Sequence, residues 1–373
     1  GRPVLQTGGS SSGAGTAVSF WAANVGTETS GSILSPASAN MLAAVKPTVG
    51  RVSRYGIIPI TADQDTAGPM ARTVTDAAIL LGVLESKDTN DTATGRCTPP
   101  PNNDYTQYLK AGGLKGARIG IPRAIFYDKF KLPGRDTAGG GLNEAQLAVM
   151  NDAIAALKAA GATIVDPADI PSVVDPDPNQ NIMLWGICTD MDAVKEGKCS
   201  IDFAYGMERD FNKWLASLGD RAPVKTLADL RRWNRDHQKM GAIKYGQSLL
   251  DISDAMDLEL FRARYERDRA RDVQLSAGHG IDEVMQAQKL DALLFPSNHG
   301  ASVAARAGYP TVIVPFGLIP NAPTPAFPEK FEAKPSPFGV SFTGSACSEP
   351  TLLRLAYAFE QATKKRVPPS AFP

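Results

Sequence analysis

The chain has 373 residues, of which 43% are hydrophobic and 21% charged, and its formal net charge is zero. This composition is that of a globular protein with enough length for a large core. The balanced charge gives no reason to expect a nucleic-acid partner, and no apolar run reaches the roughly 18 residues that a membrane span needs.

Two glycine-rich turns that carry serines lie within the first forty residues, at 7–13 and 29–32. Glycine-rich turns let several backbone N–H groups converge on one point, where they stabilise the oxyanion of an acyl-transfer reaction. Ser32 is therefore a candidate nucleophile. Because a serine hydroxyl needs a group that takes its proton, Ser10 or a neighbour is the candidate relay. The segment between the turns, residues 14–23, is predicted to be helical.

An alternation of helices and strands follows. Apolar residues at helical spacing predict a helix over 73–84, and a longer amphipathic helix over 143–160. Short apolar runs predict strands at 118–122 and 163–165. This rhythm predicts an α/β fold with a largely buried central sheet that helices cover on both faces.

The middle of the chain, about residues 183–288, is rich in charged and aromatic residues. Helical segments such as 251–271 carry dense arginines and carboxylates, which predict a solvated face with salt bridges. Trp185, Phe203 and Tyr205 are candidates for an acyl pocket, and core packing is the alternative for each of them.

Buried strands return in the last third of the chain. The predicted elements are strands at 292–296, 311–315 and 338–343 and a closing helix at 349–364. Prolines between 320 and 337 predict an extended loop, and Ser348 is a plausible N-cap of the closing helix. The segment 298–300, just after a strand, is a candidate border of the substrate site.

The four cysteines, at 97, 188, 199 and 347, do not have the spacing of metal ligands, so neither a metal nor a cofactor is expected. Cys188 and Cys199 flank a polar segment that contains a glycine. For this pair the sequence allows two interpretations, a disulfide bond or two buried free thiols. A disulfide would favour a periplasmic or secreted protein over a cytoplasmic one.

Four motifs, in order within about seventy residues, resemble the signature region of the amidase signature family. They are Gly8 to Gly13, Gly26 to Ile33, Val45 to Thr48 and Gly68 to Asp76. Weaker similarity continues to the C-terminal helix. The resemblance implies one domain over residues 1–373 with a mixed central sheet, and with a variable helical insertion at about 183–288.

The resemblance implies hydrolysis of a small carboxylic amide by a Ser-Ser-Lys triad. Ser32 would be the nucleophile, and Ser10, after a cis peptide bond, would shuttle protons. The oxyanion would be held by the backbone N–H groups of Thr29, Ser30, Gly31 and Ser32. The family's lysine lies upstream of the first turn, whereas the nine residues before Ser10 contain none.

Since the sequence starts with Gly1 rather than Met, we expect an N-terminally truncated copy that is impaired as it stands. Lys46 falls on the Val-Lys-Pro-Thr motif, to which a structural role is assigned. Glu28 is expected to support the second turn by hydrogen bonds. Asp65 and Arg72 are expected to form or support a structural polar contact, because an unpaired buried charge is costly.

Three alternatives stay open. One is the A-type subunit of an amidotransferase that acts on glutamine for tRNA transamidation, and another is a non-catalytic remnant or binding protein of the same fold. The third is an α/β-hydrolase with Ser11 in a Gly-x-Ser-x-Gly elbow. That elbow needs a buried strand before it and a histidine after it, and His237, His279 and His299 lack a supporting context. The oligomeric state is not predicted.

Overall fold

The computed structural model describes residues 4–323 and 325–369. Its strands are β1 (Ala23–Glu28), β2 (Ala43–Lys46), β3 (Thr66–Ala71), β4 (Arg118–Gly120), β5 (Thr163–Val165), β6 (Ala292–Pro296), β7 (Thr311–Ile319) and β8 (Ser336–Thr343).

The helices that precede β6 in the chain are α1 (Ser12–Ala17), α2 (Leu34–Ala39), α3 (Val74–Leu84), α4 (Glu144–Ala159), α5 (Pro171–Val174), α6 (Met191–Glu196), α7 (Asp202–Ser217), α8 (Leu227–Asp236), α9 (Ser248–Asp254), α10 (Arg262–Val273) and α11 (Asp282–Ala287). A π-helical segment, Gln274–Ile281, joins α10 to α11. After β6 come α12 (Ala301–Ala307) and α13 (Glu349–Thr363).

The strands form one eight-stranded sheet in the order β1-β3-β2-β7-β8-β6-β4-β5. Strand β4 runs parallel to β5 and β6, and the other neighbours pair antiparallel. The sheet is therefore mixed, as the resemblance implies. Both serine-bearing turns lie next to the edge strand β1. The chain passes from β1 directly into the second turn, and Ser11 of the first turn is hydrogen-bonded to Thr27 of β1.

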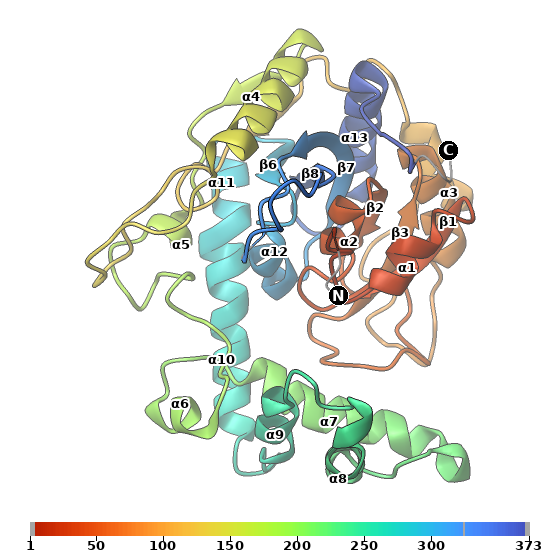
Figure 1. Cartoon of the computed structure of the whole chain (residues 1–373), viewed down its shortest axis with the longest axis vertical. Coiled ribbons are helices and arrows are strands. Elements are labelled where there is room, and N and C mark those ends of the chain that lie inside the picture. The colour runs from red at the N-terminus through yellow and green to blue at the C-terminus, as the bar shows by residue number, and fades with distance from the viewer. Residues whose placement is uncertain (1–3, 324, 370–373) are drawn as a thin grey trace.

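Helices cover the sheet on both faces, as predicted. Successive side chains of a strand point to opposite faces, and in β7 Val312 and Val314 join one core cluster while Ile313 joins another. The first cluster contains residues of α3, α4 and α13, and the second contains residues of α2. Figure 1 shows α2 and α13 on opposite sides of β7 and β8.

Helices α6, α7, α8 and α9 gather at one end of the molecule, away from the sheet, and α10 runs from that end toward α11 (Figure 1). They have apolar clusters of their own. One contains Cys188, Tyr205 and Ile252, and another contains Phe211 and Leu227. The segment from 191 to 273 thus packs largely on itself.

Two helix predictions need correction. The helix expected at 14–23 ends at Ala17, and the chain enters β1 at Ala23; Gly13 and Gly15 weaken a helix here, whereas residues 23–28 pair with β3. The helix expected at 251–271 is two helices, α9 and α10. Between them the Asp257 carboxylate accepts hydrogen bonds from the N–H groups of Glu259 and Leu260, a local turn that competes with helix.

Ser348 is the N-cap residue of α13, as predicted, but its side chain does not cap the helix. Its hydroxyl donates to the Ser345 carbonyl at 2.7 Å instead. Between β7 and β8 the described residues, 320–323 and 325–335, form neither helix nor strand, whereas Ser336 and Pro337, at the end of the predicted loop, belong to β8.

All four cysteines are paired. Cys188 and Cys199 form a disulfide, which confirms that alternative over two free thiols. Cys97 and Cys347, separated by 250 residues, form a second one that the sequence does not predict. In the part of the chain that the structure describes, no helix is long and apolar enough to cross a membrane.

Candidate active site

The first glycine-serine turn is fastened to the end of β1 by Ser11. The Ser11 N–H donates to the Ser32 carbonyl at 3.1 Å. The Ser11 hydroxyl donates to the Thr27 carbonyl at 2.9 Å and accepts from the Thr27 N–H at 3.0 Å. The peptide bond between Gly9 and Ser10 is cis, as the resemblance implies. Because the Ser11 hydroxyl is engaged both as donor and as acceptor, the elbow with Ser11 as nucleophile loses its support.

The second turn joins β1 to α2 and carries Ser32. Gly31 has a φ of +91°, a conformation that residues with a Cβ rarely adopt. The Glu28 carboxylate is 1% exposed, and its Oε2 accepts from the N–H groups of Ile33 at 2.7 Å and Leu34 at 3.0 Å. These bonds confirm the predicted role of Glu28 as a support of the turn.

Two backbone donors of the second turn have no partner in the protein. Within residues 4–323 and 325–369, no protein atom accepts a hydrogen bond from the N–H groups of Gly31 and Ser32. Unpaired donors beside a serine hydroxyl are what an oxyanion site requires. This arrangement is consistent with the donors predicted over residues 29–32.

The two candidate serines border one cavity of about 200 Å³. Its lining residues are Ser10, Thr27, Thr29, Ser32, Arg54, Ile57, Ile58, Ile60, Asp65 and Thr66. Ser10 and Ser32 are 22 residues apart in sequence, and the fold brings them to the same cavity. Part of the wall is apolar. Its three isoleucines come from the β2–β3 connection, which was not predicted to belong to the site, although the run Ile57-Ile58-Pro59-Ile60 is conspicuous there.

Arg54 is a charged group in the cavity wall that was not predicted from the sequence. Its Nε and Nη2 donate to the two carboxylate oxygens of Asp91 at 2.7 Å and 2.5 Å, and its Nη1 donates to the Ala62 carbonyl. This bidentate pairing compensates the guanidinium charge and fixes its position.

Asp65 is the acidic group of the wall. One of its oxygens accepts from the Thr29 hydroxyl at 2.5 Å and the other from the Ile60 N–H at 2.8 Å. Burial raises the pKa of the Asp65 carboxyl from 3.8 to about 6, and the hydrogen bonds from Thr29 and Ile60 oppose this shift. Asp65 thus links the second turn to the apolar wall.

Asp65 is expected to make stability depend on pH. Because the pKa of Asp65 is higher in the folded than in the unfolded chain, protonation of this carboxyl stabilises the fold. This contribution to the free energy of unfolding is complete below about pH 4 and is lost as the pH rises through about 6. Asp65→Asn keeps an acceptor for Ile60 and removes the titration. Between pH 4 and 7 the variant should gain about 2 to 3 kcal/mol of unfolding free energy relative to the parent. Urea unfolding at several pH values measures this, and parallel pH profiles for the two proteins would contradict it.

Glu28 is expected to matter through its two hydrogen bonds. Glu28→Ala leaves two buried N–H groups without a partner and should lower the unfolding free energy by about 3 kcal/mol. Glu28→Gln retains an acceptor oxygen and should lose at most about half as much. Urea unfolding of both variants tests the idea. An equal loss in both would show that the charge, rather than the acceptor, is what the turn needs.

Several other predicted residues lie outside the cavity lining. Lys46 is fully buried, and its Nζ donates to the Tyr309 carbonyl at 2.7 Å, which fits the structural role assigned to it. Burial lowers the pKa of Lys46 to about 8. Asn298 adjoins the second turn, since a Cβ built on Gly31 would stand 3.5 Å from its Nδ2. Arg72 donates to the carbonyls of residues 18 and 19, so it makes a structural contact separate from that of Asp65.

A family profile described as Amidase matches residues 3–353. The chain belongs to the amidase signature family. In residues 4–323 and 325–369 of this family member, no cluster of three or more His, Cys, Asp or Glu side chains could hold a metal ion.

Relatives of this amidase signature chain cover almost all of it. A probable amidase of Arabidopsis thaliana is 31% identical over 372 residues, 98% of the chain and 62% of the relative. The A-type subunit of a glutamyl-tRNA(Gln) amidotransferase from Thermosynechococcus vestitus is 30% identical over 97% of the chain and 69% of the relative. The chain thus spans about three fifths of the length of the plant relative.

Among solved structures, the native peptide amidase from Stenotrophomonas maltophilia is similar to this amidase signature chain. The two share 33% sequence identity with a TM-score of 0.78, and the match covers 99% of this chain and 68% of the peptide amidase. At this level of similarity the two proteins share their fold.

Proposed function

We propose that this chain carries the nucleophile and the oxyanion site of an amide hydrolase. The observation that carries the proposal is the single cavity bordered by Ser10 and Ser32, with the unpaired N–H groups of Gly31 and Ser32 beside it. The similarity to a peptide amidase and to a probable amidase supports an amide as substrate.

In the proposed mechanism, Ser32 Oγ attacks the amide carbonyl while its proton passes to Ser10, and Ser10 passes its own hydroxyl proton on to the ultimate base. The oxyanion that forms accepts hydrogen bonds from the backbone N–H groups over residues 29–32, whose donors are fixed before the reaction. Ser10 then returns the proton to the departing amine, and water hydrolyses the acyl-enzyme. The ultimate base in the resembled family is a lysine. No lysine is among the described residues that line the cavity, so the proposal assigns the base to none of them.

A covalent intermediate on Ser32 is the decisive test. The full-length protein is mixed with a primary amide and hydroxylamine, which intercepts an acyl-enzyme as a hydroxamate, and is also quenched in acid for peptide mapping. We expect hydroxamate formation and the mass of one acyl group, which fragmentation assigns to Ser32. Hydrolysis that leaves no acyl group on any serine, or an acyl group on Ser10, would reject the assignment.

The second candidate is the glutamine-hydrolysing subunit of a tRNA amidotransferase, which the T. vestitus relative favours. It uses the same acyl-enzyme chemistry on the side-chain amide of glutamine. Including L-glutamine among the amides in the trapping assay distinguishes the glutamine-hydrolysing subunit from the hydrolase of other amides. A glutaminase forms γ-glutamyl hydroxamate in preference to the hydroxamates of apolar acyl groups.

A further inference from the structure

A second cavity adjoins the catalytic one. It also measures about 200 Å³, and it is lined by Ile60, Cys188, Phe203, Ala204, Met207, Leu249, Leu250, Ile252 and Ser253. Ile60 lines both cavities, so this side chain stands between them. The remaining wall comes from Cys188 and from α7 and α9, two helices at the helical end of the molecule (Figure 1).

The wall of the second cavity is apolar. Its two residues with polar or reactive side-chain atoms are already engaged: Ser253 donates its hydroxyl to the Leu249 carbonyl at 2.7 Å, and the Cys188 sulfur is bonded to Cys199. A water molecule needs two or more polar partners, so this space favours an apolar occupant. An apolar cavity of about 150 Å³ already accepts benzene, which sets the size of the group that fits here.

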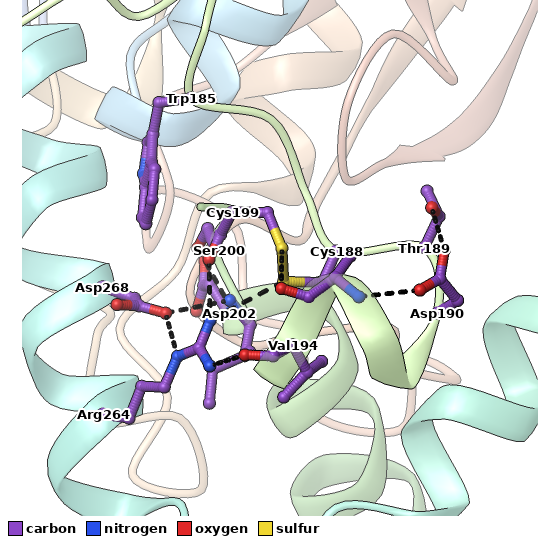
Figure 2. The surroundings of a disulfide bond; sticks show 12 residues. Trp185, Cys188, Thr189, Asp190, Val194, Cys199, Ser200, Asp202, Arg264 and Asp268 are labelled. Carbon is purple, nitrogen blue, oxygen red and sulfur yellow. Dashed lines mark hydrogen bonds and ion pairs between the residues drawn. A yellow bond between two sulfur atoms is a disulfide. The ribbon is translucent and has the colours of Figure 1, made fainter. Parts of the chain in front are cut away.

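The wall is held in place by the segment around the disulfide. Arg264 of α10 donates to the Val194 carbonyl and, at 3.1 Å, to the Cys199 carbonyl, and it pairs with Asp268 at 3.2 Å. Figure 2 shows Arg264 reaching from α10 to the disulfide segment, with the Cys188–Cys199 bond beside it. These contacts therefore fix the position of Cys188 in the cavity wall without a bound ligand.

The connection that carries Ile60 is fixed to the same helices. The Ala62 N–H donates to the Asp210 carboxylate at 2.7 Å, and Asp63 pairs with Arg209 at 2.9 Å. The Tyr265 hydroxyl donates to Asp63 at 2.8 Å. These bonds tie residues 60–63 to α7 and α10, so the two cavities keep a constant relative position. Preformed walls lower the ordering cost of binding.

We infer that the second cavity is a specificity subsite for the acyl part of the amide substrate. It receives a compact apolar group of about the size of a phenyl ring, while the scissile carbonyl lies at Ser32, and Ile60 is the side chain over which the substrate passes. The inference rests on the proposed function, since it takes the first cavity as the place of the carbonyl.

Binding to the full-length Ser32→Ala protein tests this without turnover. The probes are phenylacetamide, 3-phenylpropanamide and 4-phenylbutanamide, each compared by calorimetry with the amide that lacks the phenyl group. Burial of the ring predicts about tenfold or more tighter binding at the linker length that spans the two cavities. No gain from the ring at any of the three lengths would overturn the inference.

Met207→Gln places a polar amide in the wall at almost unchanged volume. It should remove most of the gain from the phenyl ring. Met240→Gln is the matched control, because Met240 is 82% exposed and lies outside the cavity lining. A gain that survives Met207→Gln would place the ring elsewhere and reject the subsite.

The outcome is separable from that of the proposed function. If no acyl-enzyme is trapped on Ser32 but the ring-dependent binding responds to Met207→Gln, the hydrolase proposal fails and the apolar site stands as a binding site. If the acyl-enzyme forms and the ring has no effect, the hydrolase stands and the subsite is rejected.

Discussion

Replacing Ser32 with alanine is expected to lower kcat/KM for amide hydrolysis by the full-length protein at least about ten-thousandfold. The reason is that no acyl-enzyme can form without the hydroxyl, and only the oxyanion donors and substrate binding remain to speed attack by water. Ser10→Ala should lower it about a thousandfold, the size expected for the loss of a proton relay. Amide hydrolysis followed by ammonia release gives both numbers.

The control for these variants is Ser12→Ala. Ser12 belongs to the same run of three serines, begins α1 and is absent from the cavity lining, so its loss should change kcat/KM less than threefold or so. Turnover by Ser32→Ala at the rate of the parent would reject the nucleophile. A Ser12→Ala protein as impaired as Ser10→Ala would show that the run acts through the shape of the turn rather than through one hydroxyl.

The largest effect on stability is expected from the disulfide between Cys97 and Cys347. It ties the loop after α3 to the start of α13 across 250 residues, whereas the bond between Cys188 and Cys199 closes a separation of 11. The chain-entropy relation gives about 5 kcal/mol for the long loop and about 3 kcal/mol for the short one. Cys97→Ala combined with Cys347→Ala should therefore destabilise the protein more than removal of the short-loop disulfide.

Urea unfolding of the two double variants, each without reductant, makes the comparison. The parent in reductant should lose at least as much stability as the more affected variant. Equal losses from the two pairs would mean that the disulfides act mainly through local packing and not through the entropy of the unfolded chain.

The parts of the fold that local pattern controls could be predicted from the sequence. Strands β5 and β6 and helix α4 match their expected positions closely, because uninterrupted apolar runs and the Asn143 cap define them. The helix expected at 14–23 failed because residues 23–28 pair with β3, from Ala23 with Ala71 to Glu28 with Thr66, about forty residues away. Propensity within a window cannot include such a partner.

The candidate site divides in the same way. Ser10, Ser32 and Glu28 lie in short motifs, so their roles could be predicted from the residues next to them in the sequence. The contact of Asp65 with Thr29, the apolar wall around Ile60 and the pairing of Cys97 with Cys347 join residues 36 to 250 positions apart, or depend on a loop without a motif. Only the folded chain brings these groups together. The lysine that the resemblance implies as the ultimate base stays a prediction.

The bonds of Ser11 with Ser32 and Thr27, and of Glu28 with the start of α2, have a consequence for how this enzyme could diversify. Every one of them lies within residues 11–34, and none involves the helices that form the apolar cavity. The two turns are thus held to each other by local bonds, and the Asp65 carboxylate joins them to the connection between β2 and β3. If the proposed roles hold, substitutions in α7 and α9 that keep the contacts of Arg209 and Asp210 are expected to change the acyl group that is selected and to leave the geometry of the two serine-bearing turns unchanged.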